Sequence, residues 1–253
     1  MEKNEIVSQL SEHIAFLSLN RPDARNAISK QMWLQIPQEV QKLVENGAHI
    51  IVFEGVGEAF AAGADLDELK ELKTFEDAEA NWNAIAAALY AVYSCPIPTI
   101  AAIDGACMGG GLLLACACDL RYASSRSILG LPIARLGIVL DDVNLGRLAS
   151  IIGVSRAKEM VYRAQTITAA LALTYGLVND VFDESTFIRQ IGQAVGEILK
   201  NSAISITEAK ASFARYCSLS TNMDNERAVV TSYLGPDFLD RIARIRGDKA
   251  PEQ

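Results

Sequence analysis

Three consecutive glycines, Gly109–Gly111, lie between two apolar segments and constrain the local fold more than any other feature of the sequence. The segment before them, Thr99–Ile103, is short, apolar and preceded by prolines, which is typical of a buried strand. The segment after them, Leu112–Cys118, is rich in good helix formers. Glycines at such a junction let the backbone approach a ligand or another backbone closely, because there is no Cβ. We therefore predict a strand, a glycine turn and a helix whose first turn is entirely apolar.

A strand–strand–helix order recurs after Glu54 and again after Ile103, and it predicts a mixed α/β fold wound as a spiral. Strand patterns occur at residues 5–19, His49–Glu54, Leu120–Ala123 and Leu177–Phe182. No GxGxxG or GxxxxGK[ST] motif follows any of these strands. A doubly wound nucleotide-binding sheet is therefore not expected.

Helical periodicity covers Ser29–Glu45 and Phe75–Ser94, and Pro37 inside the first segment predicts a kink or a break. Helical patterns also dominate the C-terminal part of the chain, including residues 226–246. No low-complexity linker interrupts the sequence. The predicted division is a core that carries the site, residues 1–190, and a helical region, residues 191–253.

The net charge of −8 argues against nucleic acid as a partner, because phosphate binding needs a basic face. The N-terminus has no secretory signal pattern, and the longest uncharged apolar run, Gly105–Cys118, is too short to span a bilayer. Five cysteines form no CxxC pair, and only two histidines could join them. We expect a cytoplasmic protein with reduced thiols, no metal site and no membrane partner.

A second loop of small residues, Phe60–Asp65, also follows a predicted strand and precedes a short helix. The first N–H groups of a helix have no partner inside the helix and lie at the positive end of its dipole. Two strand-to-helix loops can therefore supply two converging N–H donors. Such a pair can stabilise a developing negative charge on an oxygen atom, as in an oxyanion hole. The alternative is a close crossing of two backbones with no ligand.

Three segments together, NRPDARNAIS, AFAAGADL and PTIAAIDGACMGGGLLLACACDLRYAS, resemble the enoyl-CoA hydratase/isomerase (crotonase) superfamily. The resemblance implies a crotonase-like spiral of ββα repeats with a helical C-terminal region that assembles as trimers or dimers of trimers. It implies an acyl-CoA thioester as substrate, with no cofactor beyond the coenzyme A of that substrate. By position, the oxyanion donors would be the N–H groups of Ala64 and Gly110.

The resemblance also assigns seven positions to substrate binding: Arg25, Ala62, Asp65, Leu66, Gly109, Leu113 and Ile133. Arg25 would lie near the CoA phosphates, or would be a solvated loop arginine. Asp65 is expected to support its loop and the helix that follows. Leu113 and Ile133 occupy the two positions where hydratases of the family carry glutamates. Because leucine and isoleucine can neither activate water nor deliver a proton, ordinary enoyl-CoA hydration is not expected.

Asp141 occupies a position, counted back from Gly153, where several branches of the superfamily carry a catalytic aspartate. Its apolar neighbours, residues 138–140, predict a desolvated carboxylate that acts as the acid and base of the reaction. Asp142 is then expected to cap the helix that begins near Val143. The alternative is an exposed pair of loop aspartates, one of which caps that helix. One carboxylate beside an oxyanion hole fits a double-bond isomerase, in which the same group removes a proton and returns it.

Two other classes of function stay open on the sequence alone. One is a different reaction of an acyl thioester, such as hydration or lyase chemistry, hydrolysis, dehalogenation or decarboxylation. Dehalogenation needs a histidine in the helix at Phe75–Ser94, which has none. The other class is a scaffold that binds acyl-CoA without catalysis. The helix at Phe75–Ser94 carries the aromatic residues Trp82, Tyr90 and Tyr93. We expect them to lie in the core, and the less favoured alternative is that they line an acyl pocket.

Overall fold

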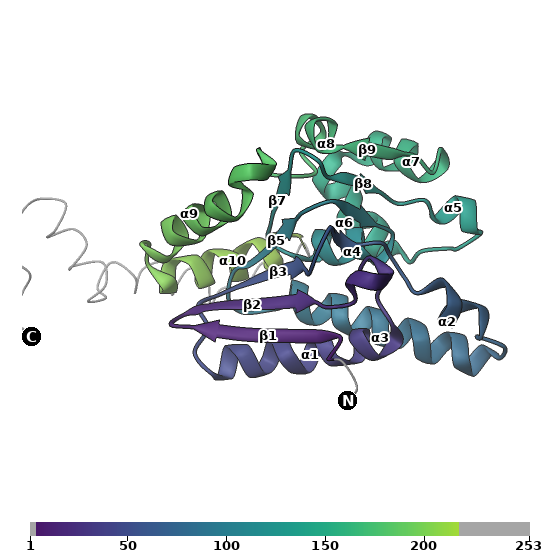
Figure 1. Ribbon diagram of the computed structural model, residues 1–253, viewed down its shortest axis with the longest axis horizontal. Helices are drawn as coiled ribbons and strands as arrows, with labels where there is room; N and C mark the ends of the chain where they lie inside the picture. The colour runs from purple at the N-terminus through teal and green to yellow at the C-terminus, as the bar shows by residue number, and fades with distance from the viewer. Residues whose placement is uncertain (1–3, 218–253) are drawn as a thin grey trace, which may run out of the picture. The chain divides into compact units, whose positions relative to one another are not determined.

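The computed structural model describes residues 4–217, and its strands form two sheets. The larger sheet has six strands in the order β1-β2-β3-β5-β7-β10, and the smaller has four in the order β4-β6-β8-β9 (Figure 1). The strands are β1 (Ile6–Ser11), β2 (Ile14–Leu19), β3 (Ile50–Gly55), β4 (Ala59–Ala61), β5 (Thr99–Ile103), β6 (Ala106–Met108), β7 (Leu120–Ser124), β8 (Ile128–Gly130), β9 (Thr166–Thr168) and β10 (Asp180–Phe182). Neighbouring strands are parallel except β1 with β2 and β8 with β9.

Successive turns of the chain give one strand to each sheet. Strand β3 is followed by β4, β5 by β6 and β7 by β8, so that each pair crosses from the larger sheet to the smaller one. Helices follow β4, β6 and β8 before the chain returns to the larger sheet. The predicted mixed α/β spiral of ββα repeats is confirmed.

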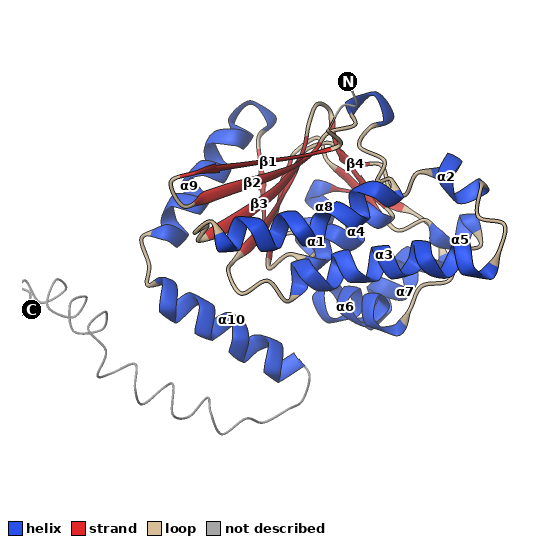
Figure 2. Cartoon of the chain, turned by 90° about the horizontal axis from the view of Figure 1, so that it is seen from below, coloured by secondary structure: helices blue, strands red, loops and turns tan. Residues whose placement is uncertain are grey.

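Ten α-helices lie within residues 4–217, together with two short 3₁₀-helices. The α-helices are α1 (Lys30–Glu45), α2 (Leu66–Lys70), α3 (Phe75–Tyr93), α4 (Gly110–Ala117), α5 (Ile133–Leu136), α6 (Asp142–Ile152), α7 (Val154–Tyr162), α8 (Ala169–Tyr175), α9 (Phe187–Leu199) and α10 (Ala203–Cys217). Helices α1 and α3 lie side by side, and α1 also packs against β1 and β2 (Figure 2). Helix α4 contacts α3, α6 and β6, so the glycine-rich helix stands at the centre of the packing.

Helix α1 is continuous across Pro37, so the predicted break at this residue is absent. The Ser29 side chain caps the helix by accepting a hydrogen bond from the backbone N–H of Met32. Buried side chains lie on both sides of the proline, among them Trp33 and Val40. Packing on both sides stabilises the helix enough to offset the one hydrogen bond that proline cannot donate.

Two compact units make up the chain, Met1–Glu197 and Ile198–Gln253. The first unit ends at Glu197, and α9 buries Phe187, Ile191 and Val195. The predicted functional division after residue 190 stays a prediction. Of the second unit the structure describes α10, and the predicted helices at residues 226–246 lie outside the described residues. The trimerisation role of this region stays a prediction.

No helix within the described residues is long and apolar enough to cross a membrane. Four of the cysteines, Cys95, Cys107, Cys116 and Cys118, are buried free thiols. Burial is the main cause that raises the pKa of Cys107 and that of Cys116 above the ordinary thiol value. These thiols therefore behave as small apolar core groups.

Arg121 of β7 is buried and fixes the C-terminus of α4. Its guanidinium donates hydrogen bonds to the carbonyl oxygens of Cys118 at 2.7 Å, Leu177 at 2.9 Å and Ala115 at 3.3 Å. A cation at this end of a helix satisfies carbonyls that have no partner in the helix and complements its dipole.

We expect Arg121→Met to lower the free energy of unfolding by about 2–3 kcal/mol, because buried carbonyl oxygens lose their donor. Urea denaturation monitored by circular dichroism measures this loss. Arg163→Met is the matched control, since the Arg163 side chain is exposed and forms a local ion pair with Glu159, four residues earlier. A loss at Arg121 no larger than the loss at Arg163 would contradict the assigned role.

Candidate active site

Two loops meet where the parallel strands β4 and β6 end. The first runs from Ala61 to Asp65, and the second contains Gly109 and Gly110. A Cβ placed on Gly63 would lie 3.2 Å from the carbonyl oxygen of Met108, so the two backbones nearly touch. Gly63 and Gly109 both have positive φ angles, 111° and 51°, which glycine adopts most easily. The predicted close approach of the two loops is therefore present.

The N–H group of Ala64 has no acceptor among the described residues. Ala64 forms a bridge with Ile28, but this bridge uses the N–H of Ile28 on the Gly63 oxygen and the N–H of Asp65 on the Ile28 oxygen. In a trans peptide the C=O and the N–H point in opposite directions. The 2.7 Å bond from Ile28 to the Gly63 oxygen therefore aims the Ala64 N–H away from Ile28.

The N–H of Gly110 likewise has no acceptor within residues 4–217, the part of the chain that the structure describes. Gly110 is the first residue of α4, so its N–H has no acceptor within the helix. The oxygen of the preceding peptide, that of Gly109, accepts a hydrogen bond from Leu113 at 3.0 Å, and the Gly110 N–H therefore points out of the helix end. A Cβ on Gly110 would lie 3.7 Å from the Ala64 nitrogen, so the two donors are neighbours.

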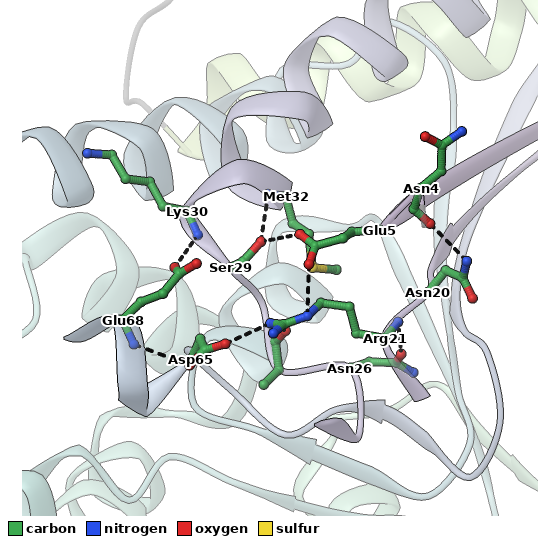
Figure 3. A network of polar contacts seen from close by, with 11 residues as sticks. Asn4, Glu5, Asn20, Arg21, Asn26, Ser29, Lys30, Met32, Asp65 and Glu68 are labelled. Atoms are coloured by element: carbon green, nitrogen blue, oxygen red, sulfur yellow. Dashed lines mark hydrogen bonds and ion pairs between the residues drawn. The ribbon is translucent and has the colours of Figure 1, made fainter. Parts of the chain in front are cut away.

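Asp65 supports this loop through both of its carboxylate oxygens (Figure 3). One oxygen caps α2 by accepting from the N–H groups of Asp67 and Glu68, and the other binds Arg21 at 2.8 Å. Burial raises the pKa of Asp65, but the hydrogen bonds from Arg21, Glu68 and Asp67 together lower it below the ordinary value. The predicted supporting role of Asp65 agrees with these contacts, and its carboxylate is occupied.

The other predicted substrate-binding residues divide into two groups. Arg25 has an exposed side chain, and its carbonyl oxygen accepts a hydrogen bond from the N–H of Ala62 at 2.9 Å. Ala62 and Leu66 are also exposed, on either side of Ala64. Leu113, by contrast, is buried one turn into α4.

Ile133 belongs to the buried group and begins α5, shortly after the end of β8. The oxygen of Gly130, the last residue of β8, accepts a hydrogen bond from the N–H of Gly109 at 2.9 Å. This bond places the segment leading to Ile133 beside the glycine turn. Leu113 and Ile133 are therefore both buried apolar side chains near the two loops.

Asp141, rather than Asp142, caps helix α6, which corrects the predicted assignment. One carboxylate oxygen of Asp141 accepts from the backbone N–H of Asn144 at 3.0 Å, and the other accepts from the Asn144 side chain at 2.7 Å. Asp142 is exposed in the first turn. The cap falls on Asp141 because Asn144 occupies the third helical position, which is where a capping side chain finds its donor.

The apolar neighbours of Asp141 do not enclose it as predicted, because Val139 is 90% exposed and Ile138 is 37% exposed. Asp141 itself is half-buried. The side chain of Asn144 is buried and accepts a hydrogen bond from Arg147, whose guanidinium lies 4.6 Å from the ring centre of Tyr93. Burial lowers the pKa of Arg147 below its ordinary value. A series of polar contacts through Asn144 and Arg147 therefore links the N-terminus of α6 to Tyr93 of α3.

Three residues of this region were not predicted. Asn144 donates hydrogen bonds to both carboxylate oxygens of Asp141, and Arg21 donates one to Asp65. The third residue is Trp33, whose Cζ2 would lie only 3.0 Å from a Cβ on Gly110. An aspartate just before a helical pattern is the sequence signal for a cap, and here two adjacent aspartates offer it. The prediction that the aromatic residues of α3 lie in the core is wrong for Tyr90, which is 68% exposed, and for Tyr93, which is 37% exposed. The second expectation, that they line an acyl pocket, stays a prediction.

Solved structures with the same fold indicate the class of protein to which this chain belongs. An enoyl-CoA hydratase/carnithine racemase from Magnetospirillum magneticum superposes with a TM-score of 0.92 at 28% identity, covering 99% of this chain and 96% of that one. The family model described as enoyl-CoA hydratase/isomerase matches residues 9–234. The chain belongs to the enoyl-CoA hydratase/isomerase family.

Relatives with different reactions are similarly close in sequence. A short-chain-enoyl-CoA hydratase from Clostridium acetobutylicum is 31% identical over 228 residues, which are 87% of this chain and 86% of the relative. A peroxisomal Δ(3,5)-Δ(2,4)-dienoyl-CoA isomerase from Arabidopsis thaliana is 32% identical over 225 residues, 83% of this chain and 81% of the relative. Family membership therefore indicates an enzyme of acyl-CoA thioesters, while the individual residues must decide between hydration and isomerisation.

Proposed function

We propose that this protein is an enoyl-CoA double-bond isomerase that uses Asp141 as its only proton shuttle. The N–H groups of Ala64 and Gly110 bind the thioester oxygen. Asp141 removes a proton from C2 of a 3-enoyl-CoA, and the electron pair delocalises onto the bound oxygen. Protonated Asp141 then returns the proton to C4, as the double bond moves from C3–C4 to C2–C3. Atoms and charge balance without any added cofactor, so coenzyme A enters only as part of the substrate.

The paired N–H donors support the enolate step. Both peptide planes are held from their carbonyl side, by Ile28 and by Leu113, so the donors need little reorganisation when charge develops. Helix α4 adds the positive end of its dipole at Gly110. Removing one such donor from an enzyme typically costs about 10²–10³ in rate.

The single observation that carries the choice of isomerisation is the pair of buried side chains Leu113 and Ile133. Hydration needs one group to activate water and another to deliver a proton, and neither side chain can do so. Asp65 is a poor substitute, because the hydrogen bonds from Arg21, Glu68 and Asp67 lower its pKa below the ordinary value of a carboxyl group. Asp141 is held on each oxygen by one Asn144 donor, which leaves lone pairs able to accept a proton.

The exposed residues around the donors suit the rest of the substrate. In this proposal the Arg25 guanidinium, which extends into solvent, attracts the CoA phosphates. Leu66, which is 51% exposed, and Ala62 contact the apolar part of the thioester arm. The buried Leu113 and Ile133 line the acyl end near the glycine turn.

A panel of acyl-CoA thioesters tests the proposal. Because two water-handling groups are missing, we expect hydration of crotonyl-CoA to be roughly 10³-fold slower than in a competent hydratase. A 3-enoyl-CoA should instead be converted to the 2-enoyl isomer, measured by chromatography of the products. Leu113→Glu is the matched gain-of-function control for water handling. Rapid hydration by the unaltered protein, with no isomer formed, would contradict the proposal.

The proposed assembly is a homotrimer or a dimer of trimers in the cytoplasm, on the family resemblance alone. Light scattering at micromolar concentration measures the mass directly. A monomer would remove this part of the proposal and leave the isomerase mechanism in place.

A further inference from the structure

We propose that Arg21 is a positioning residue that acts on the Ala64 N–H through two intervening peptide groups. This inference rests on the proposed function, because it needs Ala64 to bind the thioester oxygen. Arg21 does not reach the donor itself. It lies at the far end of a continuous chain of hydrogen bonds that ends at the donor.

The chain has two links, and each joins one peptide group to the next. The Nη1 of Arg21 donates to the carbonyl oxygen of Ala27 at 2.8 Å. The N–H on the other side of that peptide belongs to Ile28 and donates to the oxygen of Gly63 at 2.7 Å. The N–H on the other side of the Gly63 peptide is that of Ala64. The guanidinium, two peptide groups and the free donor therefore lie in series.

The order of the groups decides what Arg21 does electrostatically. Both peptides are trans, so their dipoles point the same way along the chain, with the N–H ends toward the ligand. A cation on the Ala27 oxygen polarises that peptide and makes the Ile28 N–H a stronger donor, which in turn polarises the Gly63 peptide. Such cooperative strengthening is of the order of 10–30% per bond in condensed phases. The Ala64 N–H is thereby oriented and made a stronger donor.

Arg21 is itself held on several sides, as Figure 3 shows. Its Nε lies 3.0 Å from Glu5 and its Nη1 lies 2.8 Å from Asp65. Its backbone N–H donates to the side chain of Asn26 at 2.8 Å. The Arg21 side chain is only 23% exposed, so its guanidinium has little freedom to leave the Ala27 oxygen. Because Glu5 and Asp65 contact the guanidinium directly, they offset its charge, and orientation is the larger part of the effect of Arg21.

The test uses a readout of carbonyl polarisation, which a merely structural residue would not change. Hexanoyl-CoA labelled with ¹³C at the thioester carbonyl is bound to the intact protein, and the infrared frequency of that carbonyl is measured. Binding to the unaltered protein should lower the frequency. In Arg21→Gln the shift should be smaller, and kcat for a 3-hexenoyl-CoA should fall about tenfold while KM changes less than threefold. This fall is smaller than the 10²–10³ loss of an entire donor.

Arg126→Gln is the matched control, since Arg126 is also a partly buried arginine in an ion pair, with Asp104 at 2.8 Å. It should leave both the shift and kcat unchanged. If Arg21→Gln does not fold, replacing Ile28 by its α-hydroxy acid cuts the chain at the next link, because an ester oxygen replaces the N–H that binds Gly63 and the side chains are unchanged. The same loss of shift is expected there.

A shift and kcat equal to those of the unaltered protein, in a folded Arg21→Gln or in the Ile28 variant, would overturn the inference. An equal loss in Arg126→Gln would overturn it as well, by showing a general effect of lost ion pairs. No frequency shift in the unaltered protein would be a different result, because it would contradict the proposed thioester site itself and remove the inference with it.

Discussion

Asp141→Asn should lower the turnover of a 3-enoyl-CoA by roughly 10²–10⁴, the range expected for the loss of a positioned general base. Asparagine has nearly the same size as aspartate but cannot accept the proton from C2. The affinity for acyl-CoA should change little, because binding depends on the Ala64 and Gly110 donors and on the CoA itself. Product analysis gives kcat, and isothermal titration with a saturated acyl-CoA gives the dissociation constant.

Protein stability is the quantity that separates this effect from simple loss of the α6 cap. Asparagine is about as good an N-cap as aspartate, so the bond from the Asn144 backbone N–H is retained. Only the 2.7 Å bond from the Asn144 side chain is put at risk, and its loss should cost about 1 kcal/mol. A loss of turnover that follows the fraction of unfolded protein would argue against an acid–base role.

Asp142→Asn is the matched control, because Asp142 is the adjacent residue, is exposed and caps nothing. Its turnover should stay within threefold of the unaltered protein. The opposite ranking of the two variants would assign the proton transfer to Asp142. If neither substitution changes an active protein, the base lies elsewhere and the mechanism with one carboxylate is wrong.

Sequence reasoning succeeded where the backbone alone carries the signal. The glycines at Gly63 and Gly109–Gly111 predict close approach because a Cβ would meet neighbouring backbone, and the two loops do approach each other. The buried runs at β3 and β5 predict the central strands because their residues are apolar without alternation. These features depend on local composition, and the structure contains them as predicted.

Prediction from the sequence failed where the role of a side chain depends on which hydrogen-bond or packing partner it has in the folded protein. Asp141 and Asp142 are indistinguishable by type, and only the donors of Asn144 select the first of them as the cap. Tyr90 and Tyr93 lie in an apolar helix, but the face that carries them is not the buried one. Arg21 acts through the carbonyl of Ala27, a contact within a loop that no periodicity predicts.

Gly110→Ala is the second substitution expected to have a large effect, and its two consequences have opposite signs. Alanine suits a helical position better than glycine by up to about 1 kcal/mol, so the helix itself should gain stability. The added methyl would lie 3.0 Å from Cζ2 of Trp33, which requires the ring to shift by a few tenths of an ångström. The net change in the free energy of unfolding should therefore be small.

Turnover, by contrast, should fall by about 10²–10³, as for the loss of an oxyanion donor. The methyl would lie 3.7 Å from the Ala64 nitrogen and would occupy the space that a shared oxygen atom needs. Gly192→Ala is the matched control, because Gly192 lies in helix α9 and nothing is within 4 Å of its Cβ position. It should keep full turnover. A Gly110→Ala protein that folds and retains turnover would contradict the assignment of Ala64 and Gly110 as the donors to the thioester oxygen.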